Sequence, residues 1–141
     1  MELKMYTVSL QTKLSPQFID ITDDVDAFVK ISEIDKGNAV VFSSHTTTAI
    51  IINENDSKLL QDFADVLEHL VPKKQNYNHN TSEYEGNGHS HCRQILLGSS
   101  ETVLIEDGKL CLGAWQRIFF VELDSPRDRK IIIQIMGNKN L

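Results

Sequence analysis

The sequence is poor in cysteine, in long apolar runs and in positive charge, and each shortage excludes a class of protein. Only two cysteines, Cys92 and Cys111, occur among 141 residues, too few for the disulfide framework of a small secreted domain. No apolar run approaches the roughly 18–20 residues that a membrane helix needs, so we expect no membrane partner. The first residues lack the basic region and the apolar core of a secretion signal, which predicts a cytoplasmic location.

The charge balance argues against a nucleic-acid partner. Lys and Arg number 14 against 20 Asp and Glu, which gives a net charge of −6. Such a chain repels phosphate backbones, although a small basic pocket for a phosphorylated metabolite is compatible with it. Hydrophobic residues make up 40% of the chain, which is enough for one core, so we predict a single domain over residues 1–141.

The rest of the pattern alternates strands with helices. Apolar side chains at helical spacing predict helices over residues 23–36, 57–70 and about 90–97. Thr22 and Asp56 are the predicted N-caps, and Gly37 is the predicted stop of the first helix. Alternating and β-branched runs predict strands over residues 4–11, 38–43, 48–53, 102–106, 109–112, 116–123 and 129–136.

The end of the chain is predicted to be an antiparallel meander. Asp107-Gly108 lies between two predicted strands and is the clearest hairpin signal in the sequence. Two further strands follow, joined by the short polar segment 124–128. The predicted class is therefore α+β, with a mainly antiparallel mixed sheet packed against two or three helices.

Two short polar segments flank one of the predicted strands. His45 lies among Ser and Thr residues, and this segment could bind an anion or place an imidazole at the end of a sheet. The alternative is a polar turn with a half-exposed histidine. Asn53-Glu54-Asn55-Asp56 follows the strand. Helix capping explains Asp56 but not Glu54, which could hold a metal or act as a general base.

A long polar loop over residues 73–90 is rich in Asn, Gly, His and Ser, and its two tyrosines favour a site-forming loop over disorder. His89 and His91 would share a face on a strand, but on a helix they point in nearly opposite directions, so only one could join His79. With His45 as third ligand, the histidines could hold zinc and leave one position open for water. The alternative is a solvated, histidine-rich loop.

The only tryptophan, Trp115, precedes Gln116 and Arg117 at the start of a predicted strand. Strand alternation lets at most one of Gln116 and Arg117 line a pocket together with Trp115. The ordinary alternative is a tryptophan in the core. The basic residues that could bind a phosphate are Arg117, Arg127, Arg129 and Lys130.

Several motifs, taken in chain order, resemble one known family. They are His45-Thr46-Thr47-Thr48-Ala49, Ile52-Asn53-Glu54-Asn55, Tyr77-Asn78-His79, Glu85-Gly86-Asn87, Ser90-His91 and Gly113-Ala114-Trp115-Gln116-Arg117. On these motifs the chain is similar to the YjbQ family, also called secondary thiamine-phosphate synthase, over nearly its whole length. The resemblance implies a small cytosolic protein that forms homotrimers.

The resemblance also implies an activity and a set of site residues. The activity joins hydroxymethylpyrimidine diphosphate to a thiazole phosphate and releases pyrophosphate. Alternatives are a metal-dependent phosphohydrolase and a non-catalytic trimer that binds a metal or a phosphorylated metabolite. The implied metal ligands are His45, His79 and His91, which favour zinc, with magnesium as an option for the transferase reaction. The implied catalytic residues are Glu54, His45 and Gln116, and the implied substrate-binding residues are Thr46, Thr47, Asn53, Trp115 and Arg117.

The chain departs from the family pattern at three positions. Asn80 stands where the family often has aspartate, which removes a charge that could serve as base or ligand. Ala114 replaces a usual threonine and loses its hydroxyl. Ser125 replaces a usual glycine, which we expect to alter only a turn.

Overall fold

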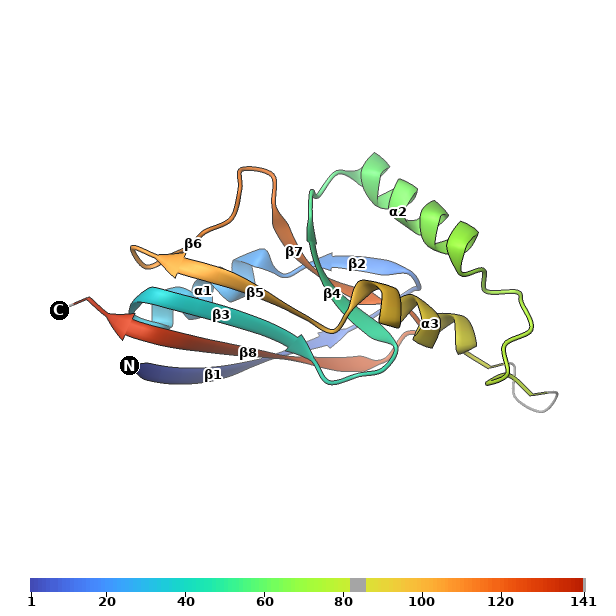
Figure 1. Ribbon diagram of the computed structural model, residues 1–141, viewed down its shortest axis with the longest axis horizontal. Coiled ribbons are helices and arrows are strands. Elements are labelled where there is room, and N and C mark those ends of the chain that lie inside the picture. Colours follow the sequence, from blue (N-terminus) through green and yellow to red (C-terminus); the bar gives the residue numbers. More distant parts are fainter. Residues whose placement is uncertain (82–85, 141) are drawn as a thin grey trace.

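The strands form two antiparallel sheets in the computed structural model, which describes residues 1–81 and 86–140 (Figure 1). The five-stranded sheet has the order β1 (Glu2–Gln11), β8 (Asp128–Lys139), β3 (Ile34–Ser43), β5 (Ser100–Glu106) and β6 (Lys109–Leu110). The three-stranded sheet has the order β2 (Gln17–Asp20), β7 (Arg117–Glu122) and β4 (Thr48–Asn53). All pairings between described strands are antiparallel.

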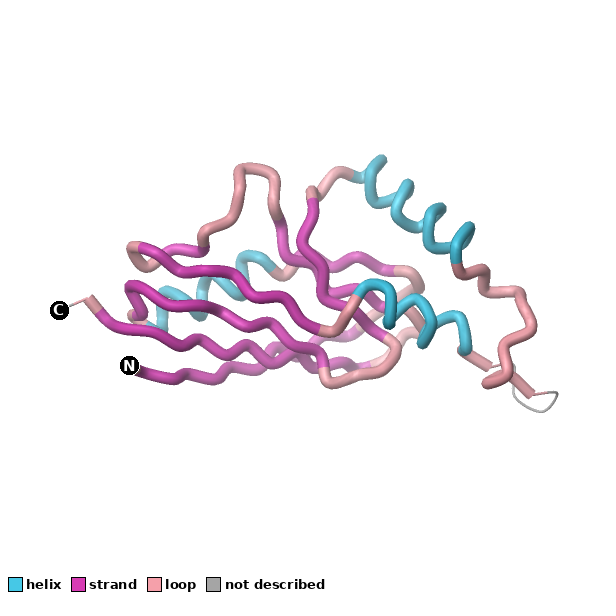
Figure 2. Tube along the Cα trace, in the orientation of Figure 1, coloured by secondary structure: helices cyan, strands magenta, loops and turns pink. Residues whose placement is uncertain are grey.

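Three helices complete the described fold, which confirms the α+β class. They are α1 (Thr22–Ser32), α2 (Ser57–Leu70) and α3 (Gly88–Leu97). α1 and the small sheet cover one face of the large sheet, with Val25, Ile118 and Ile133 in the shared core. α2 and α3 lie along the opposite face of the small sheet (Figure 2), where Leu67 packs in a second cluster with Phe119. In the described ranges, no helix has the length and apolar character that a membrane crossing requires.

Two local predictions are confirmed because their signals are local. α2 spans Ser57–Leu70 as predicted, and the Asp56 carboxylate accepts the backbone N–H of Leu59 at 3.2 Å, as an N-cap does. Asp107 and Gly108 join β5 to β6 with φ values of 52° and 72°. Both central residues of the favoured two-residue hairpin turn need positive φ, which is why this pair signals it.

The predicted end of the first helix is wrong. α1 ends at Ser32 rather than at residue 36, and Glu33 takes the left-handed conformation that Gly37 was expected to provide. Gly37 instead lies within β3, directly opposite Gly137 in β8. A side chain on Gly37 would overlap the carbonyl oxygen of Met136. The glycine is therefore required for the close approach of two strands and not for a helix cap.

The predicted cap at the start of this helix is also wrong. Thr22 is the first helical residue, and the cap position is occupied by Ile21, whose side chain makes no capping bond. The Thr22 hydroxyl accepts the backbone N–H of Ile118 at 2.8 Å, so it ties α1 to β7. The Asp20 carboxylate accepts the Thr22 N–H at 3.0 Å and takes over the role of the cap.

The predicted meander is wrong beyond its first hairpin. β7 pairs with β2 and β4, whereas β8 pairs with β1 and β3, so these consecutive strands lie in different sheets. Five residues of β7, from Ile118 to Glu122, are buried, because both faces of its sheet are covered. β8 alternates between buried and more exposed residues. β2 was not predicted, since four residues are too few to show a pattern.

Candidate functional site

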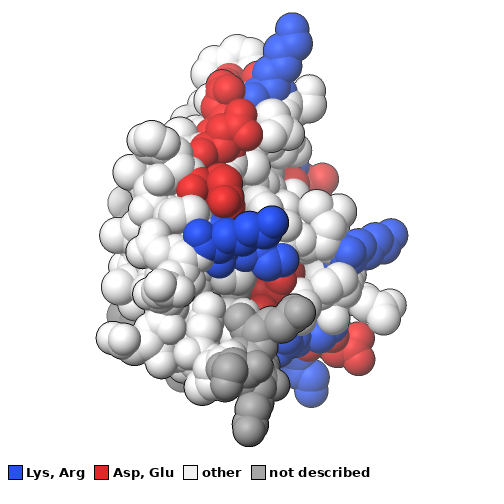
Figure 3. Space-filling model, turned by 90° about the vertical axis from the view of Figure 1, so that its right-hand side faces the viewer, with Lys and Arg blue, Asp and Glu red and all other residues white. Residues whose placement is uncertain are grey.

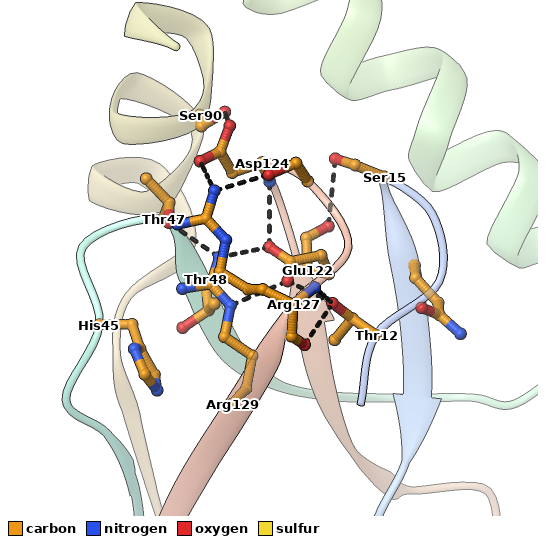
Figure 4. A network of polar contacts seen from close by, with 12 residues as sticks. Thr12, Ser15, His45, Thr47, Thr48, Ser90, Glu122, Asp124, Arg127 and Arg129 are labelled. Atoms are coloured by element: carbon orange, nitrogen blue, oxygen red, sulfur yellow. Dashed lines mark hydrogen bonds and ion pairs between the residues drawn. The ribbon is translucent and has the colours of Figure 1, made fainter. Parts of the chain in front are cut away.

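Two connections that run between the sheets meet at one end of the molecule (Figure 4). Residues 44–47 lead from β3 to β4, and residues 123–127 lead from β7 back to β8. The Leu123 N–H donates to the Thr47 carbonyl at 3.1 Å and holds them together. The first turn of α3 joins them, because Ser90 Oγ lies 3.5 Å from Asp124 Oδ1. Strand crossing thus brings three distant segments to one place.

A buried ion pair lies beneath these connections. Glu122 is 0% exposed, and the Arg129 side chain is 3% exposed. Arg129 Nε and Nη2 donate to the two oxygens of Glu122 at 2.8 and 2.6 Å, a bidentate arrangement. Arg129 Nη2 also donates to Thr47 Oγ1 at 2.9 Å, and Thr12 Oγ1 donates to Glu122 Oε1 at 2.7 Å. The Arg129 guanidinium is therefore fixed in position.

The carboxylate of Glu122 stays ionised in this buried position. Burial by itself would raise the pKa of Glu122, but the hydrogen bonds from Arg129, Thr12 and the Asp124 N–H outweigh burial and lower the pKa below its usual value. The pair is therefore charged at neutral pH, which keeps the Arg129 guanidinium held by a full negative charge.

A hollow of about 340 Å³, here named the arginine hollow, opens beside the pair. Its lining residues are Ser44, His45, Thr46, Thr47, Asn87, His91, Arg127 and Arg129. Arg127 donates to Asp124 Oδ2 at 2.8 Å, so both guanidinium groups are held by carboxylates. Basic and acidic side chains are interspersed over this end of the molecule rather than gathered into one basic face (Figure 3). The two arginines of the arginine hollow are thus a local feature of this surface.

His45 lies in the wall of the arginine hollow as a neutral donor. Burial lowers the pKa of His45, and the charge of Arg129 lowers it further, so the ring is neutral at pH 7. The backbone N–H of Lys130 donates to His45 Nε2 at 3.2 Å. A neutral imidazole that accepts at Nε2 carries its proton on Nδ1. His45 can therefore donate a hydrogen bond from Nδ1.

His79 and His91 lie together beside the arginine hollow. Their ring centroids are 4.9 Å apart. His79 Nε2 lies 3.0 Å from Asn87 Oδ1, and Asn87 Nδ2 donates to Asp124 Oδ2 at 2.9 Å. The same carboxylate oxygen binds Arg127. Asp124 therefore connects the histidine pair to one of the two arginines of the hollow.

His89 takes a separate position, as the helical spacing predicted. It is 5% exposed and does not line the arginine hollow. Its Nε2 lies 3.3 Å from Ser90 Oγ, and its Nδ1 has no hydrogen-bond partner in the described part of the chain. Burial lowers the pKa of His89, with a further contribution from Arg93, so the ring stays neutral.

The polar loop before α3 is closed onto the helix by Asn80. Asn80 Oδ1 accepts the Gly88 N–H at 3.1 Å, and the Asn80 side chain fills the space next to Gly86. An aspartate at this position could accept the same hydrogen bond. Tyr84 and Glu85 lie outside the described residues.

Arg117 lies in a different region and has a structural partner. Its Nε donates to Asp20 Oδ2 at 2.7 Å, and its Nη2 donates to Asp23 at 3.2 Å. Burial would raise the pKa of Asp20, but hydrogen bonds from Arg117, Thr22 and Asn55 outweigh it and lower this pKa from 3.8 to about 2. Arg117 therefore joins β7 to β2 and α1 and does not line the arginine hollow.

The remaining predicted site residues lie near Arg117 or on the adjacent turn. Asn53 faces Arg117 across the β4–β7 pairing, and the Glu54 N–H donates to Asn53 Oδ1 at 2.8 Å. Gln116 Oε1 accepts the Gly113 N–H at 2.8 Å. Trp115 is 74% exposed and so lies outside the core. Within one chain the predicted residues therefore form two groups, one around His45 and one around Arg117.

The Asp20–Arg117 pair predicts a loss of stability in acid. The folded-state pKa of Asp20 is about 2 against an ordinary value of 3.8, so its contribution is complete only above about pH 5 and is lost as pH falls towards 2. Because Arg117 is partly exposed, we expect a contribution of about 1–2 kcal/mol. Urea unfolding at pH 5 and at pH 2.5 should show a smaller pH effect in Asp20→Asn than in the wild type. An equal pH effect in both proteins would contradict the assignment.

Glu122 and Asp124 are not among the site residues predicted from the sequence. Glu122 ends the run Phe119-Phe120-Val121, and a charged residue in a strand this apolar signals a buried partner, because such residues are rarely buried unpaired. Nothing in the sequence identifies the partner. The role of Asp124 has no local signal, since the side chains that it binds come from separate elements.

The three predicted metal ligands do not form one set in the described structure. Over residues 1–81 and 86–140, no group of three or more His, Cys, Asp or Glu side chains is placed to hold a metal ion. His79 and His91 are neighbours, but the Nε2 lone pair of His45 is taken by the Lys130 N–H. His45 would have to turn before it could join them as a ligand.

Comparison with known proteins decides the family. The model of the family described as UPF0047 protein YjbQ-like matches residues 6–138. The chain belongs to the YjbQ/UPF0047 family. This confirms the resemblance drawn from the motifs. A UPF0047 protein of Methanothermobacter thermautotrophicus is 44% identical over 97% of this chain and 94% of that protein. YugU of Bacillus subtilis is 36% identical over 93% and 98%.

Solved structures of YjbQ/UPF0047 proteins share the fold. An uncharacterised conserved family protein from Clostridium acetobutylicum superposes with a TM-score of 0.87 at 45% identity, covering 93% of this chain and 99% of that one. A YbjQ-like protein of unknown function from Sulfolobus solfataricus gives a TM-score of 0.86 at 34% identity, covering 97% and 100%. These likenesses support the two-sheet α+β architecture.

Proposed function

We propose that the chain binds a small phosphorylated metabolite with its phosphate in the arginine hollow. The observation that carries this proposal is the pair of guanidinium groups at one hollow, each held by a carboxylate. Guanidinium groups bind phosphate oxygens through charged N–H donors. Arg129 has only Nη1 left for a ligand, since its Nε and Nη2 bind Glu122 and Thr47, but its fixed position means that it loses little freedom on binding.

Neutral donors complement the two arginines. His45 has its proton on Nδ1 because Nε2 accepts from Lys130. The Thr47 hydroxyl oxygen already accepts from Arg129, so its hydrogen can be donated to a ligand. Thr46 adds a second hydroxyl to the lining. These groups fit the predicted substrate-binding roles of Thr46 and Thr47.

The transferase reaction is the narrower form of this proposal. Glu122 and Asp124, the carboxylates beside the arginine hollow, are both engaged by arginines and are poor candidates for a base. Joining a pyrimidine diphosphate to a thiazole phosphate needs a stabilised leaving diphosphate and good positioning more than a base. Arg127 and Arg129 could bind the departing pyrophosphate. Hydrolysis needs an activated water, so the phosphohydrolase alternative has less support.

Self-association as a homotrimer and metal binding complete the proposal. The outer face of the large sheet exposes Leu3, Met5 and Leu104, at 55%, 61% and 64%, and supports an interface between copies. A cyclic trimer joins two different patches of each chain, so the group around Arg117 could meet the histidine group of the next copy.

Zinc at the histidines would act as a Lewis acid when bound. In this arrangement His79 and His91 would hold it.

Arg127→Ala tests the phosphate site. Its side chain is 46% exposed, and the partners of its guanidinium are Asp124 and Ser125 of its own connection. The variant should therefore fold normally while its affinity for inorganic phosphate falls about tenfold. Isothermal titration calorimetry at constant salt measures the affinity, and thermal unfolding checks the fold. Lys109→Ala removes the same charge from β6, at the far end of the large sheet, and serves as the control. Equal phosphate affinity in Arg127→Ala and wild type would overturn the proposal.

A further inference from the structure

A second and larger hollow lies on the other side of His45. Its volume is about 600 Å³, against about 340 Å³ for the arginine hollow. We call it the outer hollow. The two hollows share Ser44, His45 and Arg129 in their walls. A ligand anchored by its phosphate could therefore extend past His45 into the outer hollow.

Strand alternation explains why neighbouring residues serve different hollows. Successive side chains of a strand point to opposite faces. Asp128 and Lys130, which are exposed, line only the outer hollow, whereas the buried Arg129 between them lines both hollows. β1 adds to the same face, because Gln11 is opposite Asp128 and Ser9 is opposite Lys130. The outer hollow is thus built on the paired ends of β1 and β8.

The lining of the outer hollow is suited to hydroxyl groups. Besides His45 and Arg129, its polar side chains are those of Ser9, Gln11, Ser44, Asp128 and Lys130. A carboxylate accepts O–H donors, and amide and ammonium groups donate to hydroxyl oxygens. Within the described chain, neither Asp128 nor Lys130 is engaged in an ion pair, so both have free hydrogen-bonding capacity.

The same lining is poorly suited to a flat heteroaromatic ring. Such rings gain much of their affinity by stacking on aromatic side chains. Apart from the imidazole of His45, the lining contains no aromatic ring in the described residues, and Leu10 is its only aliphatic side chain. The chemistry of the outer hollow therefore differs from that of a typical base-binding pocket.

We infer that the ligand is a phosphorylated polyol or sugar whose hydroxyl-bearing carbon chain lies in the outer hollow. This inference rests on the proposed phosphate site in the arginine hollow. It specifies the chemical class of the rest of the ligand, beyond its phosphate group. It also differs from the heteroaromatic phosphates of the transferase reaction, so one set of measurements decides between the two classes.

The experiment compares three probes by isothermal titration calorimetry on the full chain. Inorganic phosphate reports the arginine hollow alone, ribose 5-phosphate adds a polyol, and the thiazole phosphate of the transferase reaction adds a heteroaromatic ring. We expect ribose 5-phosphate to bind about tenfold or more tightly than inorganic phosphate, as two or more new hydrogen bonds would give. The thiazole phosphate should gain little over inorganic phosphate.

A double variant assigns the gain to the outer hollow. Gln11→Ala with Asp128→Ala should bring the affinity for ribose 5-phosphate close to that for inorganic phosphate and leave the latter unchanged. Thr7→Ala with Gln134→Ala is the matched control, because these residues lie on the same strands and on the same face, outside the outer hollow.

Two outcomes would overturn the inference while the phosphate site stands. One is equal affinity of wild type for ribose 5-phosphate and inorganic phosphate, and the other is a preference that survives the double variant. Tighter binding of the thiazole phosphate than of ribose 5-phosphate would also overturn it and would favour the transferase substrates. Failure of all three probes to bind would instead refute the phosphate site itself, and the inference with it.

Discussion

Glu122→Ala is expected to lower the free energy of unfolding by about 3–5 kcal/mol, the usual cost of breaking a buried ion pair by removing one partner. Arg129 would remain 3% exposed and charged, with Thr47 as its only remaining partner among the described residues. Thr12 would lose the shorter of the two hydrogen bonds that its hydroxyl donates and would keep the one to the Arg127 carbonyl. Urea or guanidinium unfolding at pH 7 measures the loss. A cost below about 1 kcal/mol would show that the pair is solvated rather than buried.

A double-mutant cycle separates the ion pair from the packing around it. In Glu122→Met with Arg129→Met no buried charge is left without a partner. The second replacement should therefore cost much less in the presence of the first than alone. Strictly additive losses would contradict a direct interaction between the two side chains. The same cycle checks the site, because phosphate binding should be lost with Arg129 whichever residue occupies position 122.

Gly37→Ala is expected to cost about 3 kcal/mol or more, above the usual range for overpacking because the clash is with backbone atoms. The new methyl group would overlap the Met136 carbonyl oxygen and lie 2.7 Å from the Cα of Gly137. Neither backbone atom can move without separating β3 from β8, which are neighbours within the large sheet. Chemical unfolding, or the yield of soluble protein if folding fails, measures the effect.

Gly113→Ala is the matched control for this prediction. A methyl group there would meet only the end of the Gln116 side chain, at 3.3 Å, which can shift. Its stability should stay within about 0.5 kcal/mol of the wild type, as for most surface substitutions. Similar losses in both glycine variants would show that the cost does not come from the contact between β3 and β8, since the lower entropy of the unfolded chain by itself favours alanine at both positions.

Features with local causes could be predicted from the sequence. α2 depends on the capping side chain of Asp56 and on apolar residues spaced over its own turns, and both are visible in one window of sequence. The Asp107-Gly108 hairpin depends on two residues that tolerate positive φ. The separation of His91 from His89 follows from helix geometry alone, once the helix is placed correctly to within two residues.

Predictions failed where a residue's role depends on a distant segment. Glycine is typical of the position that ends a helix, which is why Gly37 was predicted there. Gly37 instead lies in a strand, where the close approach of Gly137 leaves no room for a side chain. The substrate-binding role of Arg117 stays a prediction, but its partner Asp20, 97 residues away, could not be identified from the sequence. For Trp115 only the alternative of a place in the core is excluded, because the side chain lies exposed on a turn.

The sequence by itself determined the family, the helix and strand propensities and the residue types available for binding an anion. Only the tertiary structure decided which of them lie together. The partition of β7 and β8 between two sheets brings Thr12, which is 110 residues away, onto Glu122, and it places His45 between two hollows. The physical reason is that helix and turn signals come from backbone bonds within a few residues. Sheet pairing and buried ion pairs form between distant segments, which one stretch of sequence does not specify.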